Sequence, residues 1–163
     1  MNARRQKRGF TLIEALISIV LLGVAIAALM VSNGAMTSAN GAGIEMSTAE
    51  FLVEQIRELT AGLPTVDPQT GKATFGAETG ENLATYDDVD DFKAKTYCPP
   101  IDAARAQLTA YIAYTQQITI DKVLATDLTA IDATGASDFF RVTVKVFLNG
   151  KELSRASWVR VKL

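Results

Sequence analysis

The chain has 163 residues, of which 48% are hydrophobic, a proportion typical of a folded protein and too high for a disordered one. Its 16 basic and 18 acidic residues give a formal net charge of −2, which excludes the basic balance of a nucleic-acid-binding protein. It has no histidine and one cysteine, Cys98, which excludes a Ser-His-Asp triad, a Cys-His pair, a His-ligated zinc site and an intramolecular disulfide. We therefore expect a protein that is not an enzyme.

The basic residues gather at the N-terminus. Arg4, Arg5, Lys7 and Arg8 lie within the first nine positions, and residues 10–163 carry the remaining 12 basic residues against all 18 acidic ones. This asymmetry is typical of a cytoplasmic positive patch that precedes a membrane segment.

An apolar segment follows this leader. Residues 15–31 carry no charge, and with residues 10–14 the segment has 22 residues, enough for a helix to span a bilayer core. A secretory signal peptide cleaved near residues 39–42 and a simple membrane anchor are both compatible with the pattern. Neither explains Glu14, because an ionised glutamate inside a membrane helix costs about 2.5–3.5 kcal/mol unless it has a partner.

The junction at residues 9–14, GFTLIE, and the apolar run after it resemble the class III signal of type IV pilins and type II secretion pseudopilins. The resemblance implies that a prepilin peptidase cuts between Gly9 and Phe10, and that Phe10 is then N-methylated. Cleavage there removes the leader cations, keeps the apolar helix and creates an amino group that can meet Glu14 of a neighbouring subunit. Because buried opposite charges offset each other's desolvation only when well placed, we expect this pair to set the axial register of packed helices.

The same resemblance implies partners and a location. The partners are the prepilin peptidase and methylase, other pilin or pseudopilin subunits and inner-membrane lipid, with no nucleic acid bound directly. Before assembly the chain is expected to cross the inner membrane once, with its N-terminus cytoplasmic and its head periplasmic. Afterwards it is expected in a pilus or a periplasmic pseudopilus.

Two glycine-containing segments, residues 32–35 and 40–43, follow the apolar run. Because glycine in a helix interior costs about 1 kcal/mol relative to alanine, they form either a linker or a helix that melts and stretches in a filament. Helical periodicity returns at residue 44, and Gly62 and Pro64 mark its end. The positions expected to face a sheet are Ile44, Thr48, Phe51, Leu52, Ile56, Leu59 and Leu63.

The expected organisation has four parts. They are a leader peptide (1–9), a transmembrane or filament-core helix (10–31), its amphipathic continuation (32–62) and a globular head (63–163). Within the head, residues 64–110 are rich in loops, with one short strand at most before residue 100, and residues 111–163 form an antiparallel sheet.

The head loop contains the acidic segment YDDVDDF at residues 86–92. Asp87, Asp88, Asp90 and Asp91 repel one another unless a cation or nearby donors offset their charge. One interpretation is a calcium site, since Ca²⁺ takes oxygen ligands from carboxylates and carbonyls, although the spacing is not that of an EF-hand. The other is a solvated acidic loop in which the aspartates cap local turns.

This acidic segment also resembles one that follows the long helix in minor pilins of the mannose-sensitive haemagglutinin type. That resemblance is short, and no metal role is transferred from it. The nearby Cys98 is expected to be a small, partly buried residue rather than a nucleophile. No other cofactor is expected.

Three alternating runs close the chain, at residues 110–124, 138–148 and 152–163. Asn149-Gly150 predicts a tight hairpin between the last two, in whose simple register Arg141 faces Trp158 as a cation–π pair. Residues 101–109 are compatible with a short helix or a loop, and residues 124–135 with a connection.

These elements predict an α+β protein in which a long N-terminal helix packs on a C-terminal antiparallel sheet, the fold that the pilin resemblance implies. The leading function is a structural subunit, a minor pilin or pseudopilin that polymerises through its N-terminal helix. The alternatives are a membrane-anchored periplasmic binding or enzymatic domain, and a calcium-stabilised adhesive subunit at a filament tip.

Overall fold

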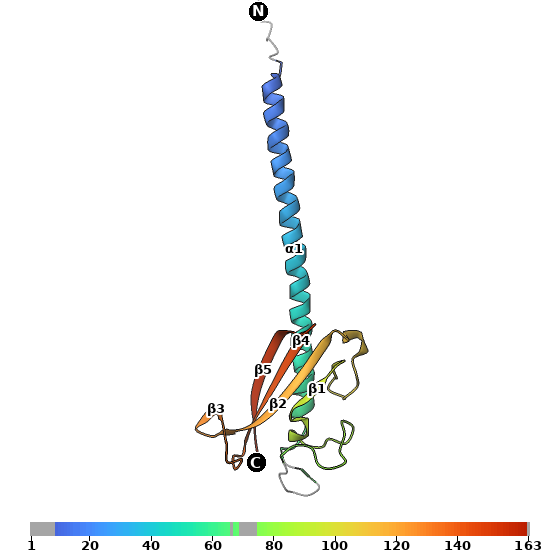
Figure 1. Ribbon diagram of the computed structural model, residues 1–163, viewed down its shortest axis with the longest axis vertical. Coiled ribbons are helices and arrows are strands. Elements are labelled where there is room, and N and C mark those ends of the chain that lie inside the picture. The colour runs from blue at the N-terminus through green and yellow to red at the C-terminus, as the bar shows by residue number, and fades with distance from the viewer. Residues whose placement is uncertain (1–8, 66, 69–74, 163) are drawn as a thin grey trace, which may run out of the picture. The chain divides into compact units, whose positions relative to one another are not determined.

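The computed structural model describes residues 9–65, 67–68 and 75–162. The chain forms two compact units, Met1–Gly43 and Ile44–Leu163, and one helix, α1 (Leu12–Ala61), contributes residues to both (Figure 1). The two glycine-containing segments lie within α1, and the second ends where the first unit ends. Of the expected leader, only Gly9 lies among the described residues.

The second unit contains a five-stranded sheet in which every strand pair is antiparallel. Its main path runs β1-β2-β4-β5, and β3 pairs with the end of β2. The strands are β1 (Lys95–Tyr97), β2 (Tyr114–Leu124), β3 (Asp127–Ile131), β4 (Phe139–Leu148) and β5 (Lys151–Val161), and two short 3₁₀ helices, η1 (Asp90–Phe92) and η2 (Thr109–Tyr111), precede β1 and β2.

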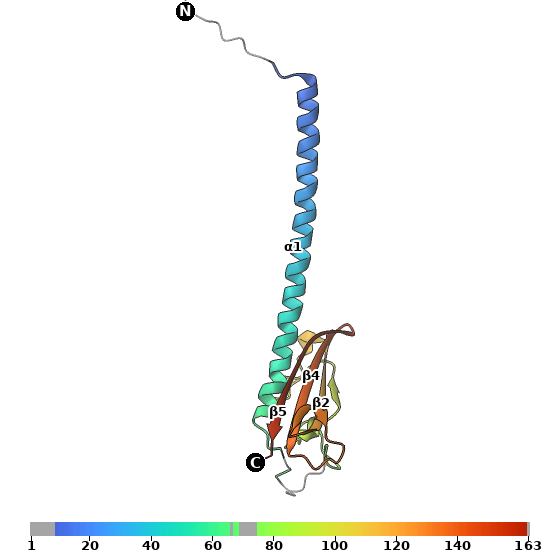
Figure 2. The same ribbon diagram turned by 90° about the vertical axis from the view of Figure 1, so that its left-hand side faces the viewer.

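The core lies between the C-terminal part of α1 and one face of this sheet (Figure 2). Alternation along most of β2 and β4 sends one set of side chains inward, for example Ile118 and Val144, and leaves polar side chains on the other face. The α1 residues buried against them are Ala49, Leu52, Val53, Ile56, Leu59 and Thr60. This α+β arrangement is the expected type IV pilin-like architecture.

The predicted helix face was partly wrong. Leu52, Ile56 and Leu59 are buried as expected, but Ile44 is 70% exposed and Phe51 is 44% exposed. The buried stripe includes Ala49 and Val53 instead, because residues three and four positions from Leu52, Ile56 and Leu59 share one face of the helix.

The predicted hairpin between β4 and β5 is present, with positive φ angles at Asn149 (49°) and Gly150 (82°) as a type I′ turn requires. The predicted cation–π pair was wrong, because β5 carries an extra residue, Leu153, between the partners of Phe147 and Val146. This bulge shifts the register, so that Val142 rather than Arg141 faces Trp158.

Trp158 therefore packs on the inner side of the sheet, where its cationic neighbour is a helix residue. The Arg57 guanidinium lies 5.0 Å from the centre of the Trp158 ring. Cation–π contact thus joins α1 to β5 rather than β4 to β5.

One further segment differs from the sequence expectation. Residues 127–131, expected in a connection, form β3, which pairs with β2. Residues 101–108, for which a short helix and a loop were both compatible with the sequence, are irregular, with one isolated bridge between Ile101 and Gln107.

Two polar side chains tie α1 to the rest of the second unit. Gln116 is fully buried; its Nε2 donates to Leu52 O (2.8 Å) and Ile101 O (3.1 Å), and its Oε1 accepts from Ile101 N (2.7 Å). Arg160 of β5 donates to the carbonyls of Thr60 (2.7 Å), Ala61 (2.9 Å) and Leu63 (2.8 Å). The carbonyls of Thr60 and Ala61, in the last turn of α1, lack intrahelical donors, so Arg160 caps α1 from the sheet.

Candidate functional site

The predicted processing and assembly residues lie together at the start of α1. Gly9 and Phe10 precede the helix in a segment without regular secondary structure, and Phe10 is 77% exposed. Glu14 lies in the first turn and is also exposed. The bond between Gly9 and Phe10 is therefore outside regular structure, as a peptidase substrate must be.

Thr11 and Glu14 form a reciprocal cap at this helix start. Thr11 N and Thr11 Oγ1 each lie 3.4 Å from Glu14 Oε2, and Glu14 N donates to Thr11 Oγ1 over 3.3 Å. This is the capping box of the pattern Thr-x-x-Glu, which satisfies amide groups that have no intrahelical partner. The pattern is visible in the sequence, but the sequence interpretation considered only the pairing of the Glu14 charge with a neighbouring subunit.

The first part of α1 presents apolar side chains on its whole circumference. The described residues contain one helix with a stretch long and apolar enough to cross a membrane, and none of that stretch is buried within the chain. Such a surface needs a cover of lipid or of other apolar helices. The large exposed side chains between residues 12 and 31 are Leu12, Ile13, Leu16, Ile17, Ile19, Val20, Leu21, Leu22, Val24, Ile26, Leu29, Met30 and Val31.

The acidic segment of the head folds around its own carboxylates. Asp88 Oδ1 accepts from the amides of Asp90 (2.9 Å) and Asp91 (3.2 Å), and Asp91 Oδ2 accepts from Asp87 (2.9 Å) and Asp88 (3.1 Å). Asp90 Oδ2 accepts from Gly76 N (2.7 Å). The expected turn capping is therefore present, but Asp88, Asp90 and Asp91 are buried rather than solvated.

Burial changes the ionisation of this segment. Desolvation, followed by the hydrogen bond and charge of Asp90, raises the pKa of Asp88 to about 8. Desolvation also raises the pKa of Asp91, against the opposing effect of its two backbone hydrogen bonds. Of the four aspartates proposed as metal ligands, Asp91 converges with two acidic side chains from outside the segment, those of Glu78 and Glu81.

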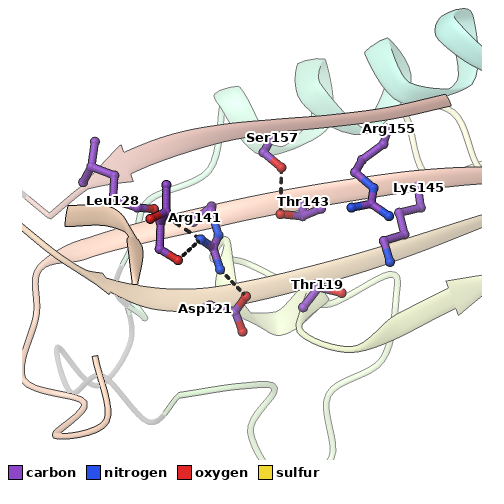
Figure 3. A pocket seen from close by; sticks show the side chains of 9 residues that line it. Thr119, Asp121, Leu128, Arg141, Thr143, Lys145, Arg155 and Ser157 are labelled. Atoms are coloured by element: carbon purple, nitrogen blue, oxygen red, sulfur yellow. Dashed lines mark hydrogen bonds and ion pairs between the residues drawn. The ribbon is translucent and has the colours of Figure 1, made fainter. Parts of the chain in front are cut away.

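The outer face of the sheet carries a shallow groove of about 470 Å³ (Figure 3). Arg141 crosses it to Asp121 (3.3 Å) and also donates to Leu128 O (3.2 Å) and Thr129 O (2.8 Å). The groove is lined by Thr119, Asp121, Leu128, Thr129, Arg141, Thr143, Lys145, Arg155 and Ser157.

Several polar groups in this groove bind one another or a neighbouring side chain. Besides the Arg141 contacts, the Thr143 and Ser157 hydroxyls lie 2.9 Å apart, and Arg155 pairs with Glu152 over 2.9 Å. These hydrogen bonds and ion pairs therefore fix the positions of several polar side chains in the groove. The sequence reasoning placed Arg141 and Thr143 on one parity of a strand but missed the groove, because one wall is β3.

Cys98 was expected to be partly buried, and this was wrong. Its side chain is exposed, with Sγ 3.7 Å from Ile112 O. The residue lies where the chain leaves the edge strand β1, so the sheet does not cover it.

Comparison with known proteins identifies one motif in this chain. Residues 4–30 match the prokaryotic N-terminal methylation motif. A search of curated proteins and a search of solved structures found no significant match. The matched residues include the predicted cleavage junction and most of the exposed apolar part of α1.

The motif, the apolar helix start and the α+β head together support a type IV pilin-like protein. A prepilin signal of this kind implies processing by a prepilin peptidase and assembly with other pilin subunits. Together with the apolar helix it points to a protein anchored in the inner membrane.

Proposed function

We propose that this chain is a structural subunit, a minor pilin or pseudopilin, of a type IV pilus or a type II secretion-type filament. The observation that carries the proposal is the methylation motif at residues 4–30, which coincides with an apolar helix that no other described part of the chain covers. The prepilin peptidase cleaves between Gly9 and Phe10 and methylates Phe10. Residues 1–9 are thus a leader, and residues 10–31 are the membrane and filament-core helix.

The proposed mechanism follows from where the charges lie. In the membrane the leader cations hold the N-terminus in the cytoplasm and the head is periplasmic. Cleavage removes the cations and leaves the apolar helix, which exchanges lipid contacts for contacts with neighbouring helices. Glu14 then pairs with the Phe10 amino group of a neighbour, which favours one axial register because other registers leave both charges unpaired.

The assignment to a minor subunit or pseudopilin rests on the acidic segment 86–92, which resembles that of minor pilins. The outer groove of the head and the exposed residues of its loop 75–92 are available for contacts that differ between subunits of one filament.

The test is the intact mass of the protein produced with and without a prepilin peptidase. We expect loss of residues 1–9 and the gain of one methyl group only when the peptidase is present. Retention of the leader, or a cut near residues 39–42, would contradict the proposal.

Gly9→Leu supplies the matched control for this experiment. A Cβ at Gly9 meets no atom within 4 Å, so the substitution leaves the fold intact. We expect this variant to keep its leader in the presence of the peptidase, since the bulkier side chain precedes the bond to be cut.

A further inference from the structure

Three carboxylates of the head, one of them from the acidic segment, lie close together. One ligand atom each from Glu78, Glu81 and Asp91 lies within 4.8 Å of the other two. Asp91 is completely buried, and the two glutamates are half-buried. Like charges at this separation in a desolvated site repel one another strongly.

Backbone amides fix the orientation of two of these carboxylates. Glu81 Oε2 accepts from Glu78 N over 3.0 Å, and Asp91 Oδ2 accepts from the amides of Asp87 and Asp88. In each of these two carboxylates, the oxygen that accepts the amide hydrogen bonds also fixes the position of the other oxygen. A set of oxygens held in this way is preorganised for a ligand.

Two of the remaining oxygens are buried and unsatisfied. Among the described residues, Asp91 Oδ1 and Glu78 Oε1 have no hydrogen-bond partner. A buried polar atom without a partner is costly, and such atoms in a folded protein need an explanation such as an ion. None of the three carboxylates pairs with a basic side chain in the described part of the chain.

We propose that Glu78, Glu81 and Asp91 bind a divalent cation, Ca²⁺, in the head of this protein. The ligand atoms are all carboxylate oxygens, which suit a hard cation, and no imidazole or thiolate lies among them to favour a transition metal. Ca²⁺ fits better than Mg²⁺ because it accepts flexible, irregular oxygen sets and completes its shell with carbonyls and water. This ligand set replaces the four aspartates of the sequence hypothesis, because the group of converging carboxylates in the described structure contains Asp91 but not Asp87, Asp88 or Asp90.

The position of the site indicates what the ion does. Glu78 and Glu81 belong to a turn in the loop, whereas Asp91 belongs to η1, whose Phe92 is fully buried in the core. An ion shared by the three residues ties that turn to the core. Ca²⁺ then stabilises the head by mass action, and the loop that it orders is a surface available to other subunits.

The test uses the full chain, purified in detergent and stripped with a chelator. Calorimetric titration with calcium chloride should give one site per chain, and saturating Ca²⁺ should raise the melting midpoint by about 3 °C or more. Magnesium chloride should bind at least about tenfold more weakly. Absence of calcium heat up to millimolar concentration would overturn the proposal.

Variants separate a specific site from general attraction to an acidic protein. Glu78→Gln and Asp91→Asn should each weaken calcium binding at least about tenfold, whereas Glu58→Gln, a matched change on the exposed side of α1, should not. Unchanged binding in Glu78→Gln would overturn the proposal. If Asp91→Asn does not fold, Glu78→Gln still decides, because Glu78 Oε1 makes no hydrogen bond in the described structure.

Asp90→Asn distinguishes this ligand set from the four aspartates. Its amide oxygen can still accept from Gly76 N, so the fold is retained, and calcium binding should stay within about twofold of the unmodified chain. Loss of binding in this variant would contradict the proposed ligand set. A negative result at this site leaves the proposed filament function untouched, because the mass measurement concerns residues 1–31 only.

Discussion

Thr11 and Glu14 bind each other at the start of α1, with Thr11 N and Oγ1 3.4 Å from Glu14 Oε2 and Glu14 N 3.3 Å from Thr11 Oγ1. Glu14 therefore has a partner within its own chain before any neighbour arrives. A helix cap of this kind contributes about 1 kcal/mol and also favours a negative charge at the positive end of the helix dipole. The single glutamate of the apolar segment thus has two separable roles, one in forming the helix start and one in the proposed assembly.

Two substitutions separate these roles. Glu14→Gln keeps an oxygen that can accept from Thr11 but removes the charge, whereas Thr11→Ala removes the cap and keeps the charge. We expect Glu14→Gln to reduce incorporation into filaments severely and Thr11→Ala to reduce it only slightly. The measurement is the fraction of each variant in sheared filaments relative to membranes, and equal incorporation of Glu14→Gln and the unmodified protein would contradict the charge-pairing role.

Gln116 is predicted to be essential for the stability of the head. Gln116→Leu leaves the N–H and C=O of Ile101 buried without partners, and each such loss costs about 1–3 kcal/mol. We expect a loss of about 2–4 kcal/mol in the free energy of unfolding. Trp158, the single tryptophan, packs against the core, so its fluorescence during urea denaturation reports this unit.

The matched control for Gln116 is its neighbour Gln117, whose side chain is exposed on the opposite face of β2. Gln117→Leu should change the unfolding free energy by less than about 0.5 kcal/mol. A similar loss of unfolding free energy in the two variants would contradict the stabilising role of the buried Gln116 hydrogen bonds.

Arg160 is predicted to stabilise the end of α1 in a way that lysine does not reproduce. Its planar guanidinium donates from two nitrogens to three carbonyls, and a single ammonium group cannot reach all of them with the same geometry. We expect Arg160→Lys to lower the unfolding free energy by about 1–2 kcal/mol, measured through Trp158 fluorescence.

A surface arginine on the same strand provides the comparison for Arg160. Arg155 pairs with Glu152 on the exposed face of β5, where ion pairs contribute little. Arg155→Lys should therefore leave the unfolding curve nearly unchanged. An equal effect of the two substitutions would contradict the capping role of Arg160.

The sequence predicts those features of this protein that are local. The apolar run, the Asn149-Gly150 hairpin and the alternation of β4 are set by neighbouring residues, and all three are present. The bulge at Leu153 and the strand β3 also pair with residues near in sequence, but an inserted residue and a short strand carry no alternation or turn signal that would reveal them. For that reason the simple hairpin register paired Arg141 with the wrong residue.

The same distinction applies to the candidate sites. The methylation motif is continuous in sequence, so its junction at Gly9 and Phe10 was recognisable without a structure. The carboxylate cluster joins residues that are 13 positions apart at the extreme, Glu78 and Asp91, and its ligands are selected by burial and by which oxygens the backbone already occupies. An acidic composition indicated the region of the chain but not these ligands.

We expect the ionisation of Asp132, in the connection between β3 and β4, to make the stability of the folded protein depend on pH. Its carboxylate accepts from Thr134 Oγ1, Thr134 N and Ser137 N, and these bonds, with the Thr134 hydroxyl first, lower its pKa below the usual aspartate value. The pKa of Asp132 is thus lower in the folded state than in the unfolded state. Ionised Asp132 therefore contributes fully to the stability of the folded state above its unfolded-state pKa, about 4. This contribution is lost as the pH falls through the lower folded-state pKa.

Asp132→Asn tests this dependence. At pH 7 the variant should be less stable than the unmodified chain, because the amide nitrogen presents donors where the carboxylate accepted from Ser137 or Thr134. Below about pH 4 the difference should shrink, since protonation removes the same charge from the unmodified chain. Asp88 and Asp91, whose pKa values are raised, favour the folded state as the pH falls, but they are common to both proteins and cancel in the comparison.

Asp138→Asn, an exposed change in the same connection, is the matched control, and its stability difference from the unmodified chain should not shrink in this way at low pH. A stability difference for Asp132→Asn that stays constant from pH 7 to about pH 3 would contradict the stabilising role of the Asp132 carboxylate.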